Sequence, residues 1–377
     1  MLVVIPLEIK KREFIQKTFL SYQILKKTEF DILIGGQRFF SKKIKSFKNV
    51  IFFDKSTYYK RIEDLINPAE NKLCMLDEEG PISLLPKQAL KFKYNKKLKG
   101  KIDHFFFWGK NDIKILSYKI DNKNKSVAGH PKFDLLKKPY VNYFDEEVKF
   151  IKKKYKNYIF YASSIDPNTK YYAGVEENYL KENYPKSSQS FIKKELKKII
   201  EYKKNTTKNQ DRAITVLRKL AIDNPEINIV FRKHPREDLE DVKKKFKNFP
   251  NNFILNDDFS ITPWIIGCDV YMHSGCSSSI EASILKKRII TIIPYGKDIR
   301  NKFFRLYGII CNEEKKCISE LNKIGEYKIL KEYKPMKNYI FNSNKKFFFY
   351  NEFIKYLKKN NLKDRESKIL FHKEVKN

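Results

Sequence analysis

Three adjacent carboxylates, Asp77, Glu78 and Glu79, follow a short apolar segment in the N-terminal half of the chain. Carboxylates this close repel one another, so burial should raise the pKa of at least one of them. A general base needs such a raised pKa to take a hydroxyl proton near pH 7. The same residues would also suit an acidic surface turn, and the sequence leaves both interpretations equally open. A magnesium site would need a second acidic cluster at suitable spacing, which the sequence lacks.

A basic turn in the second half of the chain contains a histidine followed by a proline. Its members are Arg232, Lys233, His234 and Pro235. Cationic side chains and an imidazole N–H donate strong hydrogen bonds to phosphate oxygens, so the turn could hold an anion. Taken alone, a His-Pro dipeptide is more typical of an ordinary solvated turn.

A glycine turn and three consecutive serines follow another apolar segment. The serines open a predicted helix, and the N–H groups of a helix N-terminus favour phosphate. Ordinary N-capping needs one serine, so the run favours a phosphate site, with a carboxylate one turn later to accept hydrogen bonds from ribose. The candidate nucleotide-binding residues are His273, Ser274, Gly275, Ser277, Ser278, Ser279 and Glu281.

Two further pairs, Trp108-Gly109 and Gly129-His130, lie between the acidic motif and the basic turn. Each pair is equally consistent with a turn or helix cap and with the lining of a ligand cleft.

The motifs follow segments that are predicted to be buried strands. Short apolar runs alternate with helical segments, which is typical of βαβ units in a parallel sheet. The alternation occurs in two series, so the predicted fold class is α/β, with two Rossmann-like, doubly wound domains and a cleft between them. Ligands of such sheets bind beyond the carboxyl ends of strands. The expected domains are 1–155, which carries the acidic motif, 156–335, which holds the nucleotide, and a tail, 336–377.

The tail is rich in lysine and aromatic residues. It is expected to form a helix that packs back on the body of the protein. The alternative is a basic amphipathic helix that lies on a membrane.

The chain is strongly basic, with 79 Lys and Arg residues against 45 Asp and Glu residues and a formal net charge of +34. Lysine supplies most of the positive charge and is spread along the whole chain, whereas nucleic-acid readers favour arginine. The composition therefore favours solvated lysine faces over a specific nucleic-acid site. Such a surface still attracts anionic lipid head groups and anionic substrates.

No apolar run is long enough to cross a bilayer, and the N-terminus reads as a first strand and not as a signal peptide. A cytoplasmic protein is therefore expected, with peripheral contact at the inner face of the membrane as a further option. The five cysteines are scattered without a CxxC pair, so neither a disulfide framework nor a zinc site is expected.

Taken in order, the motifs resemble those of bacterial surface-carbohydrate biosynthesis proteins, which are similar to GT-B glycosyltransferases. The resemblance covers about residues 1–300 and includes the motifs described above. It adds five residues that would lie with Trp108, Gly109, Gly129 and His130 in the acceptor site or cleft. These are Glu8, Arg12, Gly35, Gly36 and Gln37.

The pattern also resembles GT-B sialyltransferases and polysialyltransferases, and transferases of Kdo and pseudaminic-type acids. That resemblance implies Glu78 or Glu79 as the base, or as a nucleophile in a retaining enzyme. It implies His234 as the phosphate partner and Ser277 and Ser278 as the phosphate cradle. The chain departs from the pattern in its extra carboxylate, and in a His and a Lys at 130 and 132 where Asn and Arg are expected.

The implied enzyme transfers a Kdo or sialic-type sugar from its CMP ester to a glycan or lipid-linked glycan of a bacterial surface polysaccharide or lipopolysaccharide. No cofactor or metal is expected, because His234 and nearby cations can stabilise the single phosphate of CMP. A nucleotide-sugar 2-epimerase or a polyol-phosphate transferase of similar fold is one alternative. A non-catalytic polyanion-binding protein is an alternative of another class.

Overall fold

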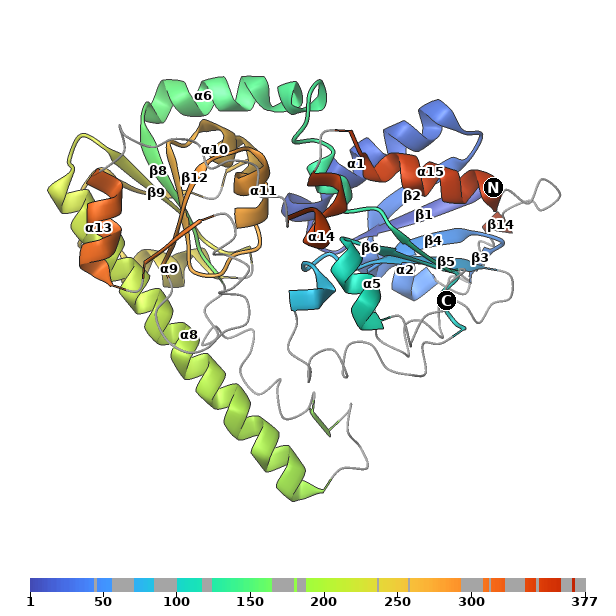
Figure 1. Ribbon diagram of the computed structural model, residues 1–377, viewed down its shortest axis with the longest axis horizontal. Coiled ribbons are helices and arrows are strands. Elements are labelled where there is room, and N and C mark those ends of the chain that lie inside the picture. Colours follow the sequence, from blue (N-terminus) through green and yellow to red (C-terminus); the bar gives the residue numbers. More distant parts are fainter. Residues whose placement is uncertain are drawn as a thin grey trace, which may run out of the picture. The chain divides into compact units, whose positions relative to one another are not determined.

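The chain divides into two compact units (Figure 1). Unit 1 comprises residues 1–143 and 334–377, and unit 2 comprises residues 144–333. The helix at 145–155 thus groups with unit 2, and the tail groups with unit 1. The computed structural model describes residues 1–43, 46–55, 71–84, 100–116, 124–164, 180–181, 188–235, 237–256, 258–292, 308–311, 313–322, 336–343, 346–360 and 368–369.

Unit 1 is built on a parallel sheet of six strands in the order β2-β1-β4-β5-β6-β7. The chain runs from β1 to β2 at one edge and then continues on the other side of β1, so the strand order reverses between β1 and β4. The strands are β1 (Leu2–Leu7), β2 (Asp31–Gly36), β4 (Ile51–Asp54), β5 (Lys72–Leu76), β6 (His104–Phe107) and β7 (Lys125–Val127).

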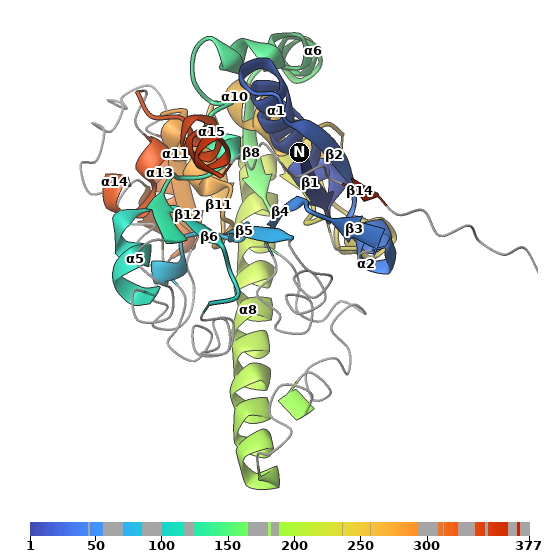
Figure 2. The same ribbon diagram turned by 90° about the vertical axis from the view of Figure 1, so that its right-hand side faces the viewer.

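Helices cover both faces of this sheet (Figure 2). α1 (Lys10–Lys27) and α15 (Phe349–Lys359) lie side by side on one face, and α2 (Gln37–Lys43) and α5 (Lys110–Leu116) cover the other. The shorter elements are η2 (Ile82–Leu84), η5 (Pro131–Phe133), η6 (Tyr140–Phe144), α14 (Met336–Tyr339), η9 (Phe341–Ser343) and the pair β3 (Phe47–Lys48) and β14 (Lys368–Ile369).

The tail helix α15 contributes to the core of unit 1. Its Phe349 and Phe353 pack on Phe53 and Phe106 of the sheet, with ring centroids 4.8–5.8 Å apart. Burial of one such phenyl group stabilises a fold by roughly 1.5–3 kcal/mol. Asp134 accepts hydrogen bonds from the first two N–H groups of α15, at 2.9 and 3.1 Å, and so caps the helix.

Unit 2 is also built on a parallel sheet of six strands, in the order β10-β9-β8-β11-β12-β13. The strand order here reverses between β8 and β11, because the chain first extends from β8 toward β10 and then returns. The strands are β8 (Tyr158–Ala162), β9 (Asn228–Arg232), β10 (Phe253–Asn256), β11 (Val270–His273), β12 (Arg288–Ile292) and β13 (Ile309–Cys311).

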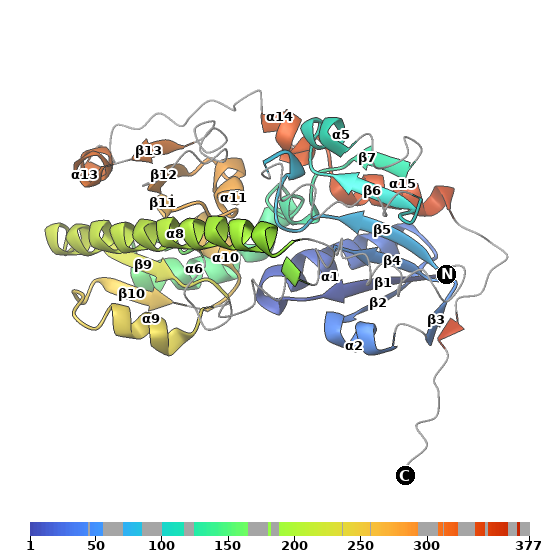
Figure 3. The ribbon, with the colours of Figure 1, turned by 90° about the horizontal axis from the view of Figure 1, so that it is seen from below.

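The helices of unit 2 also cover both faces of its sheet. α8 (Gln189–Asp223), α9 (Leu239–Lys245) and α13 (Glu314–Asn322) share one core with the sheet, and Figure 3 shows α8 lying over the middle of the sheet, lengthwise along the strands. α6 (Asp145–Tyr155), α10 (Ile261–Gly267) and α11 (Ser279–Ile284) complete the unit. α8 is continuous over 35 residues, because its sequence includes no proline or glycine.

Candidate functional site

Three neighbouring strands of unit 2 end at the same edge of the sheet, and polar residues lie at their ends or directly after them. β8 lies between β9 and β11, and Ala162 pairs with Arg232 on one side and His273 on the other. The loops that follow are in contact, since Ser164 Oγ donates to the carbonyl oxygen of Ser274 (3.3 Å). This edge is the point where the strand order reverses, which is where open α/β sheets bind ligands.

The basic turn after β9 is held in shape by Glu237. Its carboxylate accepts hydrogen bonds from the backbone N–H of His234 (2.6 Å) and from Gln210 Nε2 (3.0 Å). The Lys233 ammonium donates to the Glu237 carbonyl oxygen (3.0 Å). Lys233 is buried, whereas the His234 side chain is half-buried and Pro235 is exposed. The turn therefore places the half-buried His234 at the end of β9, while Lys233 braces the backbone.

Arg232 also braces the fold. Its guanidinium is buried and donates to the carbonyl oxygens of Asp258 and Phe259, both at 2.7 Å. These bonds tie the end of β9 to the loop after β10. Arg232 contributes positive charge to the edge of the sheet, but these two N–H groups already have acceptors.

His273 organises the glycine turn after β11. The imidazole is fully buried, and its Nδ1 accepts hydrogen bonds from the backbone N–H groups of Gly275 and Cys276, both at 3.1 Å. The proton must then be on Nε2, which donates to Thr291 Oγ1 of β12 (2.9 Å). Burial lowers the pKa of His273 to about 3, so it stays neutral. Gly275 has a φ of +97°, which favours glycine.

The serines divide into one exposed residue and two buried ones. Ser277 is exposed, whereas Ser278 bonds to the Tyr271 hydroxyl (2.6 Å) and Ser279 donates to the Cys276 carbonyl oxygen (2.7 Å). Helix α11 starts at Ser279 and has only six residues, so its dipole is weaker than that of the helix predicted from 277. Ser277 is therefore the serine side chain best placed to meet a ligand.

Glu281 does not face solvent. Its side chain is buried, and its Oε2 accepts a hydrogen bond from Thr262 Oγ1 (3.4 Å) of α10. The structure thus gives this carboxylate a partner within unit 2.

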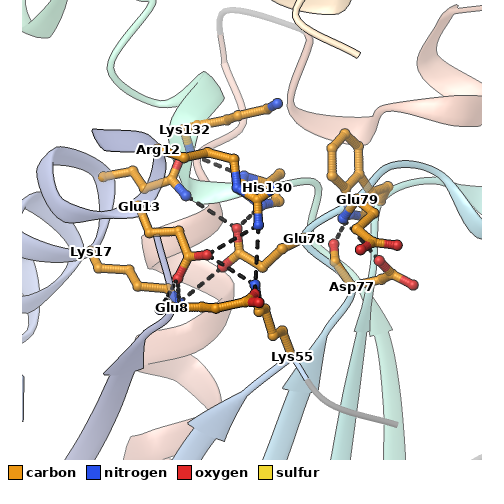
Figure 4. Close-up of polar contacts among 12 residues, drawn as sticks. Glu8, Arg12, Glu13, Lys17, Lys55, Asp77, Glu78, Glu79, His130 and Lys132 are labelled. Atoms are coloured by element: carbon orange, nitrogen blue, oxygen red, sulfur yellow. Dashed lines mark hydrogen bonds and ion pairs between the residues drawn. The ribbon is translucent and has the colours of Figure 1, made fainter. Parts of the chain in front are cut away.

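Unit 1 carries a buried ion network at the carboxyl ends of β1, β4 and β5 (Figure 4). Lys17 of α1 lies at its centre, and its ammonium contacts Glu13 Oε2 (2.9 Å), Glu78 Oε1 (3.2 Å) and the Pro6 carbonyl oxygen (2.8 Å). Lys55, after β4, pairs with Glu13 Oε1 (2.9 Å) and with Glu8. These groups occupy the reversal point of the first sheet.

The network keeps its carboxylates ionised. Burial would raise the pKa of Glu78, but the Lys17 ammonium and the His130 hydrogen bond hold it well below its usual value. Burial is likewise outweighed at Glu13, where Lys17 and Lys55 lower the pKa to about 2. The two carboxylates raise the pKa of Lys17 despite its burial. The raised pKa that the sequence suggested therefore does not occur at Glu78, because Lys17 and the His130 hydrogen bond outweigh its burial.

His130 holds the other oxygen of Glu78. Its Nε2 lies 2.9 Å from Glu78 Oε2, and its Nδ1 accepts from the backbone N–H of Lys132 (3.2 Å), so Nε2 carries the proton. Burial lowers the pKa of His130, which keeps the ring neutral. The Trp108 ring packs on it with centroids 4.7 Å apart. Gln16 Nε2 donates to the same Glu78 oxygen (3.1 Å).

Asp77 and Glu79 point away from the network (Figure 4). The buried Asp77 accepts from the backbone N–H of Glu79 (2.9 Å), and its carbonyl oxygen accepts from Trp108 Nε1 (2.5 Å). Gly80 has a φ of +143°, which glycine alone adopts readily. The Glu79 side chain is exposed. Of the three carboxylates, Glu79 is the one whose side chain reaches solvent.

Gly109 and Gly129 lie where the backbone of unit 1 comes into direct contact with the C-terminal tail. A Cβ atom at Gly109 would overlap the backbone of residues 338–339, and one at Gly129 would overlap the side chain of Asn342. Asn342 also accepts from the N–H of His130 (3.0 Å) and donates to its carbonyl oxygen (2.8 Å). The glycines that the sequence suggested as a cleft lining thus allow residues 336–343 to pack on unit 1.

The N-terminal candidates lie at two places in unit 1. Glu8 and Arg12 join the rim of the ion network, where about a third of each side chain is exposed. Gly35 and Gly36 end the edge strand β2, and Gln37 begins α2. A Cβ atom at Gly35 would lie 3.1 Å from the Phe40 ring, so this glycine allows α2 to pack closely.

Sequence reasoning missed the centre of the network. Glu13, Lys17 and Lys55 were not among the candidates, although Glu13 and Lys17 are spaced i, i+4 on the face of α1 that should be apolar. Charges at buried helical positions would have been the available signal.

In the part of the chain that the structure describes, no helix is long and apolar enough to cross a membrane. Among the same residues, no group of three or more His, Cys, Asp and Glu side chains is arranged to hold a metal ion.

Searches of protein families and curated proteins found no match for this chain. The fold does match solved structures. Methanocaldococcus jannaschii UDP-GlcNAc 2-epimerase, in complex with UDP-GlcNAc and UDP, aligns with a TM-score of 0.59 and 14% identity over 95% of this chain and 100% of its own. The UDP-bound S. aureus MnaA aligns with a TM-score of 0.60 and 10% identity over 97% and 98%.

The wall teichoic acid polymerase TagF is a third match, with a TM-score of 0.56 and 12% identity over 96% of this chain and 88% of that structure. At such low identities the likeness concerns the fold. It establishes the predicted two-domain, GT-B-like α/β architecture for nearly the whole chain.

Proposed function

We propose that this protein is an enzyme of nucleotide-activated sugars and binds the nucleotide at the carboxyl ends of β8, β9 and β11. The observation that carries the proposal is that the loops after β8, β9 and β11, which contain Ser164, His234 and Ser277, begin side by side where the strand order of the second sheet reverses. Polar strand ends and cations at that point suit a phosphate group. In this proposal His234 and Ser277 contact the phosphate, while Arg232 and His273 hold the loops in place.

A uridine nucleotide is favoured over the CMP ester suggested by the sequence. The similar structures include two that hold UDP or UDP-GlcNAc, with alignments over 95% or more of this chain. A CMP-activated Kdo or sialic-type sugar is therefore the alternative substrate, which the binding experiment below tests through CMP.

The leading reaction is 2-epimerisation of a UDP-N-acetylhexosamine. Inversion at carbon 2 requires a base to take a proton from that carbon and an acid to return one. Unit 1 offers Glu79 for this role, because its side chain is exposed while Glu78 is locked in the ion network. In this proposal Glu78 and His130 position the loop that carries Glu79.

Transfer to a surface glycan is the second candidate. The TagF polymerase shares the fold over most of both chains. An exposed carboxylate such as Glu79 could equally deprotonate an acceptor hydroxyl. The product distinguishes the two: an epimerase converts a UDP-sugar without any acceptor.

Calorimetric titration of the full chain with UDP, CMP and CDP tests the nucleotide site. We expect UDP to bind, His234→Ala to weaken that binding by about tenfold or more, and Lys244→Ala, an exposed change on α9, to leave it unaltered. Equal UDP affinity in wild type and His234→Ala would contradict the assignment. Preferential binding of CMP would favour a CMP-sugar as the substrate over a UDP-sugar.

Incubation with UDP-GlcNAc in heavy water tests the reaction. Epimerisation should exchange the proton on carbon 2 for deuterium, and Glu79→Gln should abolish the exchange while UDP binding persists. Glu240→Gln, on the exposed surface of α9, provides the matched control. Exchange that persists in Glu79→Gln would remove Glu79 from the role, and consumption of the UDP-sugar only with a glycan acceptor would favour transfer.

A further inference from the structure

Helix α1 buries polar side chains and exposes apolar ones, the reverse of the usual pattern for a helix that covers a sheet. Five of its seven buried residues are polar; the seven are Glu13, Gln16, Lys17, Leu20, Ser21, Gln23 and Ile24. Phe14, Tyr22 and Leu25 are 41%, 55% and 54% exposed. The ion network explains the buried side. The contacts of the described residues of unit 1 do not account for the large apolar groups on the solvent side.

The exposed apolar residues lie along one side of α1, with the exposed Thr18 between Phe14 and Tyr22. Phe14 and Tyr22 are two helical turns apart, and Leu25 follows after three residues, so all three project from the same side of α1. Lysines lie at both ends, and the ammonium groups of Lys10 and Lys26 lie 5.9 Å from the ring centroids of Phe14 and Tyr22. We call this surface the outer face of α1; it comprises Lys10, Lys11, Phe14, Tyr22, Leu25 and Lys26.

The outer face is positively charged without any carboxylate of its own. The sole acidic residue of α1 is Glu13, which is buried in the ion network. The neighbouring helix α15 adds exposed Lys355, Lys358 and Lys359. Lysines therefore lie along the described surface of both helices, with Glu352 of α15 as a half-buried carboxylate among them.

We propose that the outer face of α1 docks unit 1 on an anionic lipid bilayer. Aromatic and leucine side chains partition into the head-group region, and lysines beside them are attracted to anionic lipids. The apolar centre with lysines at both ends matches an interfacial helix. α15, which the sequence suggested as the membrane element, buries its apolar residues within unit 1, so α1 carries the exposed apolar residues.

Charge disfavours a second copy of the chain as the occupant. Two outer faces in contact would place lysines against lysines, in a chain of net charge +34. A nucleic acid or an anionic glycan would pair with the lysines but would leave Phe14, Tyr22 and Leu25 in water. An anionic lipid surface complements both the charged and the apolar residues.

Co-sedimentation of the full chain with vesicles tests the proposal. The vesicles contain phosphatidylcholine alone, or phosphatidylcholine with phosphatidylglycerol. The apolar variant combines Phe14→Ser, Tyr22→Ser and Leu25→Ser, and its control combines Phe150→Ser, Ile200→Ser and Ile222→Ser, which lie in unit 2 and are at least as exposed. The charge variant combines Lys10→Gln, Lys11→Gln and Lys26→Gln, and its control combines Lys193→Gln, Lys194→Gln and Lys197→Gln on α8.

We expect binding only to vesicles with phosphatidylglycerol. The apolar variant should weaken it by about tenfold or more, and the charge variant by about a hundredfold, since each lysine near the surface contributes about fivefold. Both controls should bind within about twofold to threefold of the wild type, because their sites lie off the outer face. Absence of binding, equal losses in the controls, or a dimer that the apolar variant dissociates would overturn the proposal.

A single substitution gives a second measurement that does not depend on the folding of the triple variants. Tyr22→Trp adds an indole to the outer face, and Phe150→Trp adds one to α6 as the control. Brominated phosphatidylglycerol vesicles should quench the fluorescence of the first variant and not the second. Equal quenching of both, or of neither, would contradict docking through α1.

Discussion

Replacement of Lys17 by methionine removes the central cation of the buried network in unit 1 and keeps the length of the side chain. The Lys17 side chain is 2% exposed, and the Glu13 and Glu78 side chains that it contacts are 0% and 3% exposed. Methionine packs in the same space but donates no hydrogen bond. The substitution therefore leaves two buried carboxylates with fewer cations.

The expected cost follows from the partners that remain. Loss of one partner from a buried ion pair costs roughly 3–5 kcal/mol, because the other charge stays buried. Glu13 keeps Lys55, and Glu78 keeps its hydrogen bond from His130. We therefore expect the lower end of that range, about 3 kcal/mol in the free energy of unfolding of unit 1.

Fluorescence can report unit 1 separately, because one tryptophan lies in each unit. In a Trp264→Phe background, Trp108 is the sole tryptophan of the chain and packs on His130 beside the network. Urea unfolding of this background, with and without Lys17→Met, gives the difference in stability. Lys26→Met is the control, since it makes the same chemical change at an exposed position of the same helix.

A second substitution tests whether the lost stability comes from the interaction between Lys17 and Glu78. In a double-mutant cycle, Lys17→Met and Glu78→Gln together should cost less than the sum of the two single changes, by about 1–3 kcal/mol. If Lys17→Met costs no more than Lys26→Met, or if the two changes are additive, the network does not stabilise unit 1 as argued.

Three further predictions concern the same structure. Because ion pairs depress the pKa of Glu13 from 4.5 to about 2, its stabilisation is present above pH 4.5 and is lost as the pH falls toward 2; Glu13→Gln should flatten this acid dependence in Trp108-monitored unfolding. His273→Phe leaves two backbone N–H groups without their acceptor, so unit 2 should lose about 1–3 kcal/mol and bind UDP more weakly by titration, and an unchanged melting temperature would contradict this. Gly129→Ala should lower the stability of unit 1 by more than Gly100→Ala, since both have positive φ but only the first meets the tail; equal losses in urea unfolding would show that backbone strain alone matters.

The architecture could be predicted from the sequence because short apolar runs and helical segments alternate regularly. The structure has a parallel six-stranded sheet in each unit, and the motifs follow strands as expected. The basic turn and the serine segment come together because β9, β8 and β11 are neighbours. Strand adjacency is a property of the topology, which local sequence patterns do not report.

The site was harder to predict because it depends on which side chains are already engaged in contacts within the folded protein and which are left to meet a ligand. Glu78 looked like a base, but Lys17, 61 positions earlier, pairs with it. Gly109 and Gly129 looked like cleft residues, but their contacts come from residues 338–342. Local sequence can mark a charge on the buried face of a helix, but it does not show which distant residue that charge contacts. The left-handed conformation of Gly275 and the exposure of Ser277, in contrast, agree with what a turn after a strand suggests.

The central claim is that unit 2 binds a nucleotide at the carboxyl ends of β8, β9 and β11. Hydrogen-exchange mass spectrometry of the full chain, with and without UDP, tests it most directly. The account predicts slower exchange in peptides that cover residues 161–164, 232–235 and 273–279, with no change around the ion network of unit 1. Protection confined to unit 1, or no protection at a UDP concentration that saturates binding by calorimetry, would contradict it.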